Sequence, residues 1–271
     1  MTDLPLMVPI PGGGLTLHDA RRKTSRPVDL ERFSLAQTPV TWAQYTSVLG
    51  THVPAGESPD APVHSITWTE AVHWCDRASA AAGLGRAYSS AGVEADVEAE
   101  SNGEASADAE ADVGWDVSAD GFRLPTEAEW EWACRGGTAG PHYGPLHDIA
   151  WTGDDEMTSA VDVGLKQPNA FGLYDMLGNV WEWCWDYVDP ARYVDYRVLR
   201  GGGWADRPWS VRASVRRGSM PSARLDDVGF RPARGAVGDP GNQSAQGWSH
   251  RSDRERARSG EPVGFGWTPL R

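Results

Sequence analysis

The abundance of tryptophan is the feature that most constrains how this chain can fold. Its 271 residues include 14 tryptophans, together with 31 glycines and 19 prolines. Indole rings are large packing anchors, whereas glycine and proline favour turns over regular structure. The chain is 40% hydrophobic, which is enough to build a core in one large domain or two small ones. We therefore expect a loop-rich fold in which aromatic side chains anchor the loops.

Regular elements are expected at a few places in the first third of the chain. Residues 8–17 favour a short strand and a turn, and residues 28–35 favour a strand because apolar and polar residues alternate in it. Helices are expected to begin after Thr41 and after either Thr67 or Thr69. In both cases a threonine can cap apolar residues that follow at helical spacing.

The later segments add one clear helix and two strands. Thr126 and Glu129 have the spacing of a capping box, and two glycines can close the helix that follows. Residues 169–186 end in an alternating stretch, whose three tryptophans would share one face of a strand. Residues 228–234 resemble a closing strand. The mixture predicts an α+β chain.

Two segments look different from the rest. Residues 90–114 are low-complexity, and they include eight acidic residues and no basic one between Glu94 and Asp112. We interpret them as a solvated insertion, either an inert linker or an acidic docking arm. Residues 235–271 are rich in Gly, Ser, Arg and Pro and predict a flexible tail. The net charge of −13 argues against a nucleic-acid partner.

The cysteines make a poor disulfide framework, because Cys75, Cys134 and Cys184 are odd in number and irregularly spaced. The sequence leaves open that one pair is bridged. Cys134 and Cys184 lie in aromatic-rich runs and are expected to pack as small apolar residues. Residues 1–14 have neither a basic start nor a long apolar core, so no signal peptide or membrane span is predicted. We expect a cytoplasmic protein without a membrane partner.

Five segments occur in an order and with a composition that are unusual in combination. They are VPIPGG at 8–13, GFRLPTEAEWE at 121–131, NAFGLYDMLGNVWEW at 169–183, RVLRGG at 197–202 and VGFR at 228–231. Together they resemble the formylglycine-generating enzyme (sulfatase-modifying factor) family over roughly residues 6–234. The resemblance implies an irregular C-type-lectin-like α+β fold of low regular secondary structure. It also predicts a domain over residues 1–234.

The resemblance also shows what this chain lacks. Enzymes of the family oxidise a sulfatase cysteine to formylglycine with dioxygen, using two cysteines five residues apart, and bacterial members bind copper(I) between them. The two matching positions are Asp206 and Val211, and Gly203 stands where a serine helps to place oxygen. Copper(I) needs soft sulfur ligands, so no copper is expected here.

A branch of this fold has a similar segment without cysteines. It carries Arg-Gly-Gly-Ser-Trp-x-x-x-Pro-x-x-x-Arg, a spacing that Arg200 to Arg212 follows, including Pro208. The branch includes variable proteins of diversity-generating retroelements, in which the stretch is hypervariable and displays a ligand-binding surface. The residues after Arg234 depart from that pattern, since the variable stretch usually ends the chain.

A calcium site of the family is matched by residues 175–182. The resemblance implies that the Asp175 side chain, the Gly178 and Val180 carbonyls and the Glu182 carboxylate hold a structural calcium ion. Hard oxygen donors of this kind suit calcium. The alternative is that the two acidic side chains cap turns and bind backbone amides.

The main hypothesis is a calcium-stabilised binding protein with a protein or peptide ligand. Tryptophan and arginine are frequent in binding hot spots, and residues 203–217 are rich in both. The candidate ligand-binding residues are Trp204, Asp206, Arg207, Trp209, Arg212 and Arg216. Alternatively, Trp204 lies in the core and the arginines form a solvated face.

A second hypothesis is a divergent metal-dependent oxidase with Asp206 as a metal ligand. The intact scaffold motifs motivate it. A single carboxylate without histidines makes a poor redox site, which favours the binding protein. The sequence does not indicate the oligomeric state.

Overall fold

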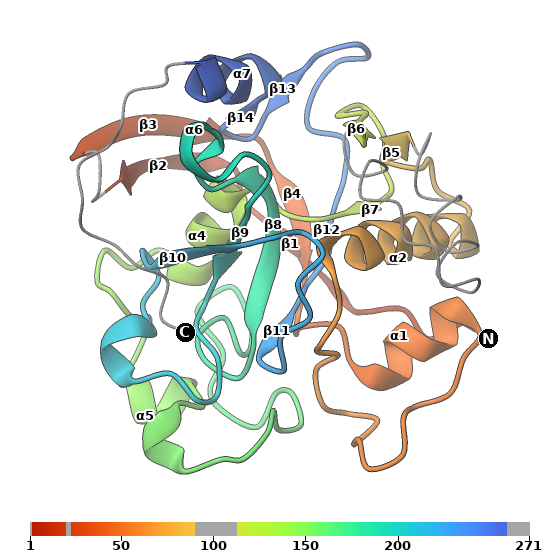
Figure 1. Ribbon diagram of the computed structural model, residues 1–271, viewed down its shortest axis with the longest axis vertical. Helices are drawn as coiled ribbons and strands as arrows, with labels where there is room; N and C mark the ends of the chain where they lie inside the picture. The colour runs from red at the N-terminus through yellow and green to blue at the C-terminus, as the bar shows by residue number, and fades with distance from the viewer. Residues whose placement is uncertain (1, 20–22, 90–112, 259–271) are drawn as a thin grey trace.

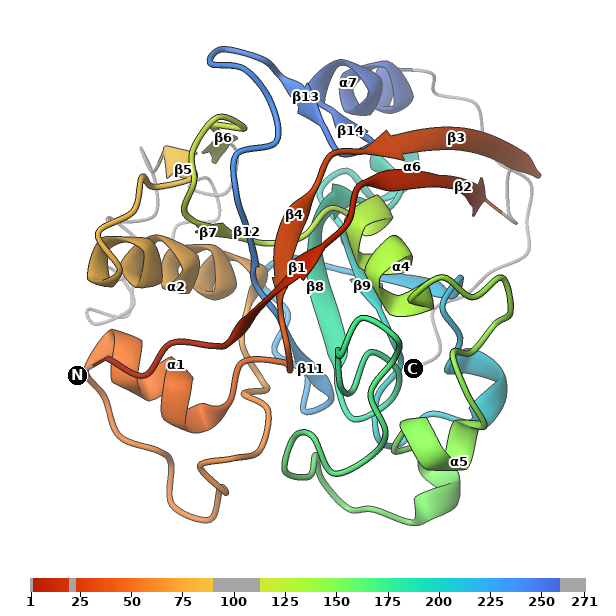
Figure 2. The same ribbon diagram turned by 180° about the vertical axis from the view of Figure 1, so that it is seen from behind.

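The structure, a computed structural model, describes residues 2–19, 23–89 and 113–258. Short helices surround a central pair of four-stranded sheets, and long ordered loops connect them (Figures 1 and 2). The helices are α1 (Trp42–Leu49), α2 (Trp68–Ala81), α4 (Glu127–Arg135), α5 (Leu146–Ile149), α6 (Pro190–Tyr193) and α7 (His250–Arg258). None of the helices in these ranges is long and apolar enough to cross a membrane. The fold is therefore α+β, as expected from the sequence.

The strands form two four-stranded sheets, in which some neighbouring strands are not consecutive in sequence, and three two-stranded pairs. One sheet has the order β1 (Met7–Ile10), β4 (Phe33–Ala36), β12 (Ala233–Arg234), β7 (Phe122–Arg123). The other has the order β10 (Arg216–Ser219), β9 (Arg197–Arg200), β8 (Trp181–Tyr187), β11 (Val228–Gly229). The pairs are β2 (Gly13–Asp19) with β3 (Thr24–Leu30), β5 (Tyr88–Ser89) with β6 (Gly114–Trp115), and β13 (Ser244–Ala245) with β14 (Trp248–Ser249).

Local capping explains where α1, α2 and α4 begin. Thr41, Thr67 and Thr126 each accept a hydrogen bond from the backbone N–H three residues on, and each is completed as a capping box. The predicted starts are confirmed, with Thr67 rather than Thr69 capping α2. Gly136 ends α4 at φ +52°, a left-handed conformation that favours glycine.

The predicted strands are correct in type but wrong in extent. Over residues 8–17, β1 and a break at Pro11 and Gly12 match the expected strand and turn, but β2 then continues to Asp19. The strand expected over 28–35 is broken between β3 and β4. The closing strand over 228–234 divides between the two sheets, because β11 pairs with β8 and β12 with β4 and β7. Strand breaks that depend on distant partners leave no local signal.

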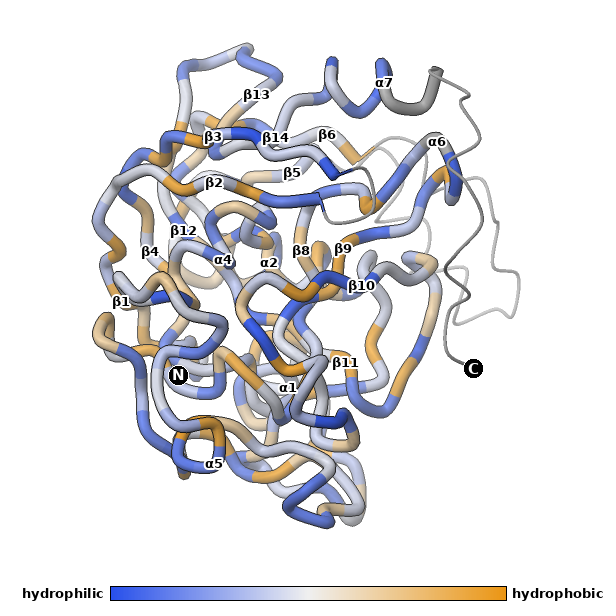
Figure 3. Tube along the Cα trace, turned by 90° about the vertical axis from the view of Figure 1, so that its left-hand side faces the viewer, coloured by the Kyte–Doolittle hydropathy of each residue, from blue (hydrophilic) through white to orange (hydrophobic). Residues whose placement is uncertain are grey.

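Tryptophans of the core meet around Trp185 at the end of β8. Its ring lies 5.3 Å from that of Trp68, 5.7 Å from that of Trp115 and 5.7 Å from that of Trp248, and it stacks on Tyr88 at 5.0 Å. β8 is buried on both faces, because Glu182, Cys184 and Asp186 are as buried as the tryptophans with which they alternate. In Figure 3, α7 is largely hydrophilic.

The expectation of a flexible tail from residue 235 is corrected for residues 235–258. They form β13, β14 and α7, and the Trp248 side chain is buried in the aromatic cluster. Gln246 donates to Glu129 Oε1 at 2.8 Å, and its carbonyl accepts from Thr126 Oγ1 at 2.7 Å. Residues 259–271 lie outside the described residues. So does most of the predicted acidic insertion, residues 90–112, whereas Gly114 belongs to β6.

Candidate functional site

The candidate ligand segment, residues 203–217, consists of an irregular loop and the first two residues of β10. β9 leads into it and β10 leads out of it, with Arg200 opposite Arg216. Gly201 and Gly202 begin the loop at φ +101° and +89°, values that favour glycine. A Cβ on Gly202 would approach Val211 Cγ2 to 2.9 Å, so the loop folds closely back on itself.

Asp206 holds this loop together. Its Oδ2 accepts hydrogen bonds from Trp181 Nε1 at 2.5 Å and from the Gly203 N–H at 2.9 Å. Its Oδ1 accepts from Ser210 Oγ at 3.2 Å and from Arg217 Nη2 at 3.2 Å. The carboxylate is therefore engaged by its own protein, which makes it a loop organiser and leaves it poorly suited to be the metal ligand that a divergent oxidase needs.

Three of the other predicted residues point outward. The Trp209 side chain stands in the 3-10 turn η3 (Pro208–Ser210) and the residue is 61% exposed. Arg207 and Arg212 are also exposed, and neither side chain forms a hydrogen bond or ion pair with residues 2–19, 23–89 or 113–258. Trp204 is half-buried, and its Nε1 is buried without a partner in the described part of the chain.

Arg216 and Arg217 are held by the scaffold. Arg216 Nε lies 2.7 Å from Glu127 Oε1, and its Nη1 lies 3.9 Å from Asp19 Oδ2. Arg217 stacks over the Trp181 ring at 4.5 Å while it pairs with Asp206. The structure thus separates Arg216 from the exposed residues with which the sequence grouped it.

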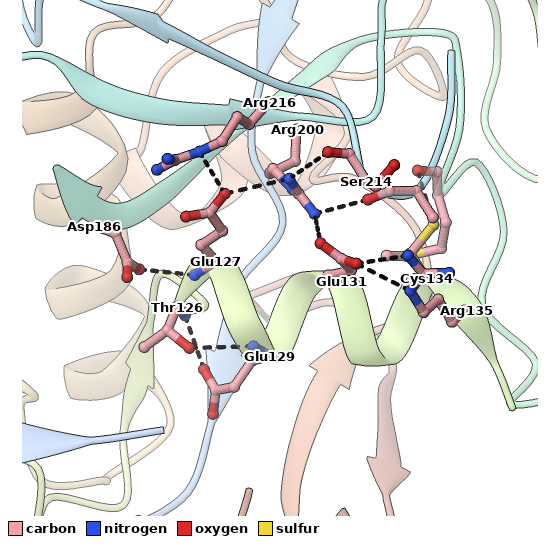
Figure 4. A network of polar contacts seen from close by, with 12 residues as sticks. Thr126, Glu127, Glu129, Glu131, Cys134, Arg135, Asp186, Arg200, Ser214 and Arg216 are labelled. Carbon is pink, nitrogen blue, oxygen red and sulfur yellow. Dashed lines mark hydrogen bonds and ion pairs between the residues drawn. The ribbon is translucent and has the colours of Figure 1, made fainter. Parts of the chain in front are cut away.

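A buried charge network lies beneath the segment and fixes α4 against the second sheet (Figure 4). Arg200 of β9 reaches Glu127 at 3.2 Å and also pairs with Glu131, and both carboxylates come from α4. Asp186 Oδ2 accepts from the Glu127 N–H at 2.7 Å. Burial raises the pKa of Asp186 to about 7, and the nearby Glu127 carboxylate adds to the shift. Buried charges of this kind are tolerated because they are paired.

The surface is hollowed beside the exposed residues. The hollow has a volume of about 610 Å³. It is lined by Gly153, Asp154, Ala205, Arg207, Pro208 and Trp209. The 3-10 turn η2 (Gly153–Asp155) forms one wall, and the Gly153 N–H binds the Asp206 carbonyl at 2.7 Å. In Figures 1 and 2 the turn at Pro208–Ser210 lies beside α5.

The positions that match the family's catalytic residues lack its chemistry. Val211 is fully buried and apolar. A Cβ on Gly203 would approach Asp227 Cβ to 2.9 Å, so Asp227 fills the space that a serine would need. Burial raises the pKa of Asp227 to about 6, and Asp206 adds to the shift. The sequence analysis missed Asp227, since it lies 21 residues beyond Asp206.

No thiol is placed to replace the missing pair. Cys75, Cys134 and Cys184 are all fully buried and unpaired. Burial raises the pKa of all three thiols, which disfavours the thiolate that a copper(I) site requires. Within residues 2–19, 23–89 and 113–258, no three side chains of His, Cys, Asp or Glu cluster as a metal site would need.

The segment expected to bind calcium divides into two parts. Asp175 is buried at φ +51°, and its Oδ1 has no hydrogen-bond partner among the described residues, although its Oδ2 accepts from the Gly164 N–H at 2.7 Å. Glu182 is instead neutralised by Arg231, whose Nη2 lies 2.8 Å from Oε1 and whose Nε lies 2.8 Å from Oε2. Trp130 Nε1 donates to the same carboxylate at 2.6 Å.

Comparison with known proteins decides the family. The sulfatase-modifying factor enzyme 1-like domain matches residues 1–236. The chain belongs to this family. The inactive Cα-formylglycine-generating enzyme 2 of Bos taurus is 38% identical over 141 residues, which cover 45% of this chain and 46% of that protein. The formylglycine-generating enzyme of Streptomyces coelicolor is 34% identical over 149 residues, covering 43% and 48%. The chain thus matches about half the length of these two members of the sulfatase-modifying factor family.

Solved structures confirm the formylglycine-generating-enzyme-like, C-type-lectin-like fold. Treponema denticola variable protein 1 superposes with a TM-score of 0.72 at 29% identity, covering 84% of this chain and 94% of that one. CarF superposes with a TM-score of 0.67 at 24% identity, covering 85% and 98%. The family scaffold is therefore retained although the residues at its catalytic positions have changed.

Proposed function

We propose that this chain is a binding module without oxidase activity, and that residues 203–217 carry its ligand surface. The observation that carries the proposal is that some side chains of this loop hold its conformation while others are exposed. Asp206 is fully used in holding the loop, whereas Arg207, Trp209 and Arg212 stand exposed. An exposed indole beside arginines is typical of a protein-binding hot spot.

The ligand of this surface is a protein or peptide. The likeness to Treponema denticola variable protein 1 supports a further part of the proposal, namely that the exposed positions of the loop are diversified on a constant scaffold. Sequencing the gene from independent isolates tests it. Substitutions are expected to concentrate at the positions of Arg207, Trp209 and Arg212. An even spread over the buried Trp181 and Val211 would contradict it.

Peptide selection tests binding itself. A displayed random-peptide library is selected on the wild-type protein, and the enriched peptides are measured on Trp209→Ala. We expect Trp209→Ala to lose affinity about tenfold or more, as truncation of a hot spot does. The matched control is Leu165→Ala, since Leu165 is 64% exposed but lies outside the loop. Equal binding by wild type and Trp209→Ala would overturn the proposal.

We also propose a structural calcium ion at Asp175, with the Gly178 and Val180 carbonyls as further ligands. The buried Asp175 Oδ1 without a partner supports this assignment, because an unpaired buried carboxylate oxygen is costly unless a cation neutralises it. Glu182 fits less well, since Arg231 and Trp130 already engage it. The ion would secure the loop that leads into β8.

A further inference from the structure

The hollow beside Trp209 contains two charges of opposite sign that do not neutralise each other. Asp154 and Arg207 both line it and both are exposed. No ion pair joins them. Among the described residues, neither side chain has a hydrogen-bonding partner. The two groups are therefore available to a ligand.

The walls that carry these charges are held in place by hydrogen bonds and an ion pair. Beside Asp154, Thr152 accepts from the Asp154 N–H at 3.3 Å, and Lys166 pairs with Asp155 at 3.1 Å. A Cβ on Gly153 would approach the Ala205 carbonyl oxygen to 2.9 Å, which shows how closely the two walls meet. The wall with Arg207 is held by Asp206 through Ser210 and Gly203. Such preorganisation lowers the cost of binding.

We propose that the hollow recognises a peptide segment of a partner protein that carries both an acidic and a basic side chain. The acidic side chain pairs with Arg207 and the basic one with Asp154, while apolar atoms between them cover Trp209. This inference rests on the proposed function and adds the chemistry of its ligand. Arginine binds carboxylates through two parallel hydrogen bonds, and an indole face also attracts cations.

A peptide fits this hollow better than a free small molecule. Small-molecule sites enclose most of the ligand surface. Here Trp209 is 61% exposed, and both charged side chains stand at an open rim. An extended chain can cover all three groups at once.

The test is a change of preference after charge reversal. The same displayed library is selected separately on wild type, Arg207→Glu and Asp154→Lys. Wild type is expected to enrich peptides with both charges. Arg207→Glu is expected to replace the acidic position by a basic one, and Asp154→Lys to do the reverse. Wild-type peptides should bind either variant about tenfold more weakly.

The controls reverse exposed charges outside the hollow and outside the ligand surface. Arg32→Glu and Glu156→Lys should leave the enriched sequences unchanged, because neither residue lines the hollow or belongs to residues 203–217. Two failures are distinguishable. Peptides that need Trp209 but show the same charges on all variants would overturn this inference and leave the binding function standing. A library that yields no peptide dependent on Trp209 would overturn both.

Discussion

Asp206 occupies a position that matches a catalytic cysteine of the family, and it performs a structural task there. One carboxylate satisfies the indole of Trp181, the Gly203 N–H and two side chains of the loop. Removing it leaves these donors without an acceptor, including the Trp181 indole and the Gly203 N–H, which belong to buried residues. Its contribution is therefore to stability and to the presentation of its neighbours.

We expect Asp206→Ala to lower the free energy of unfolding by about 2–3 kcal/mol, because it strands hydrogen-bond donors. Urea unfolding followed by tryptophan fluorescence measures this. Asp154→Ala is the matched control, since that exposed carboxylate binds no described side chain, and its effect should stay within about 0.5 kcal/mol. Equal unfolding curves for the two variants would refute the structural role of Asp206.

Trp209 and Trp248 form a matched pair for a second test. Trp248 is buried against Trp185, so Trp248→Ala should cost about 3–5 kcal/mol of unfolding free energy. Trp209 is exposed, so Trp209→Ala should change it by less than about 0.5 kcal/mol. A small effect of Trp248→Ala would mean that β14 does not belong to the folded core.

At the scale of elements, α4 connects the two four-stranded sheets of the molecule, including the strands on either side of the ligand loop. Its carboxylates Glu127 and Glu131 bind arginines of β9 and β10, and Glu129 pairs with Arg123 of β7 at 2.6 Å. Asp186 of β8 meets the first turn of the same helix. One helix thus fixes both sheets.

The titration of Asp186 gives this junction a pH dependence. The pKa of Asp186 is about 7 in the folded protein, well above that of an unfolded aspartate, so the folded state retains a proton that the unfolded state releases. Its contribution to stability is greatest at acidic pH and is lost as pH rises from about 4 to about 7. Asp186→Asn should remove on the order of 1 kcal/mol per pH unit from the slope in this window. Unfolding midpoints across pH measure it, and identical slopes in both proteins would contradict it.

The sequence predicts local elements well and their pairing poorly. The capping threonines predict the starts of α1, α2 and α4, because each cap and its partner lie only three residues apart in the sequence. Arg231 lies 49 residues from Glu182, and nothing near either residue reveals their pairing. Likewise Trp248 looks like part of a polar tail until its contact with Trp185 is known. Within the candidate ligand surface, only the three-dimensional structure distinguishes the exposed residues from Arg216, which is half-buried and paired with Glu127.

For the whole molecule, metal content separates the two functions weighed for this family member. We expect purified protein to contain calcium and no stoichiometric copper or iron, and a chelator to lower its thermal midpoint. Elemental analysis and melting curves before and after chelation measure both quantities. Asp175→Asn should abolish the effect of the chelator. A melting temperature that the chelator leaves unchanged would refute the calcium site. Stoichiometric copper or iron would favour the oxidase, and an oxygen-consumption assay would then be the next measurement.

Residues 203–217 include side chains that are bonded to the rest of the protein and side chains that are exposed without a bond to the described residues, and this has an evolutionary consequence. Asp206 and Ser210 are committed to the scaffold, whereas Arg207, Trp209 and Arg212 are not. Mutations at the free positions are then nearly neutral for folding, so selection can explore new specificities there without first accumulating compensatory changes. The specificity of binding and the stability of the fold thus depend on different residues of a single loop.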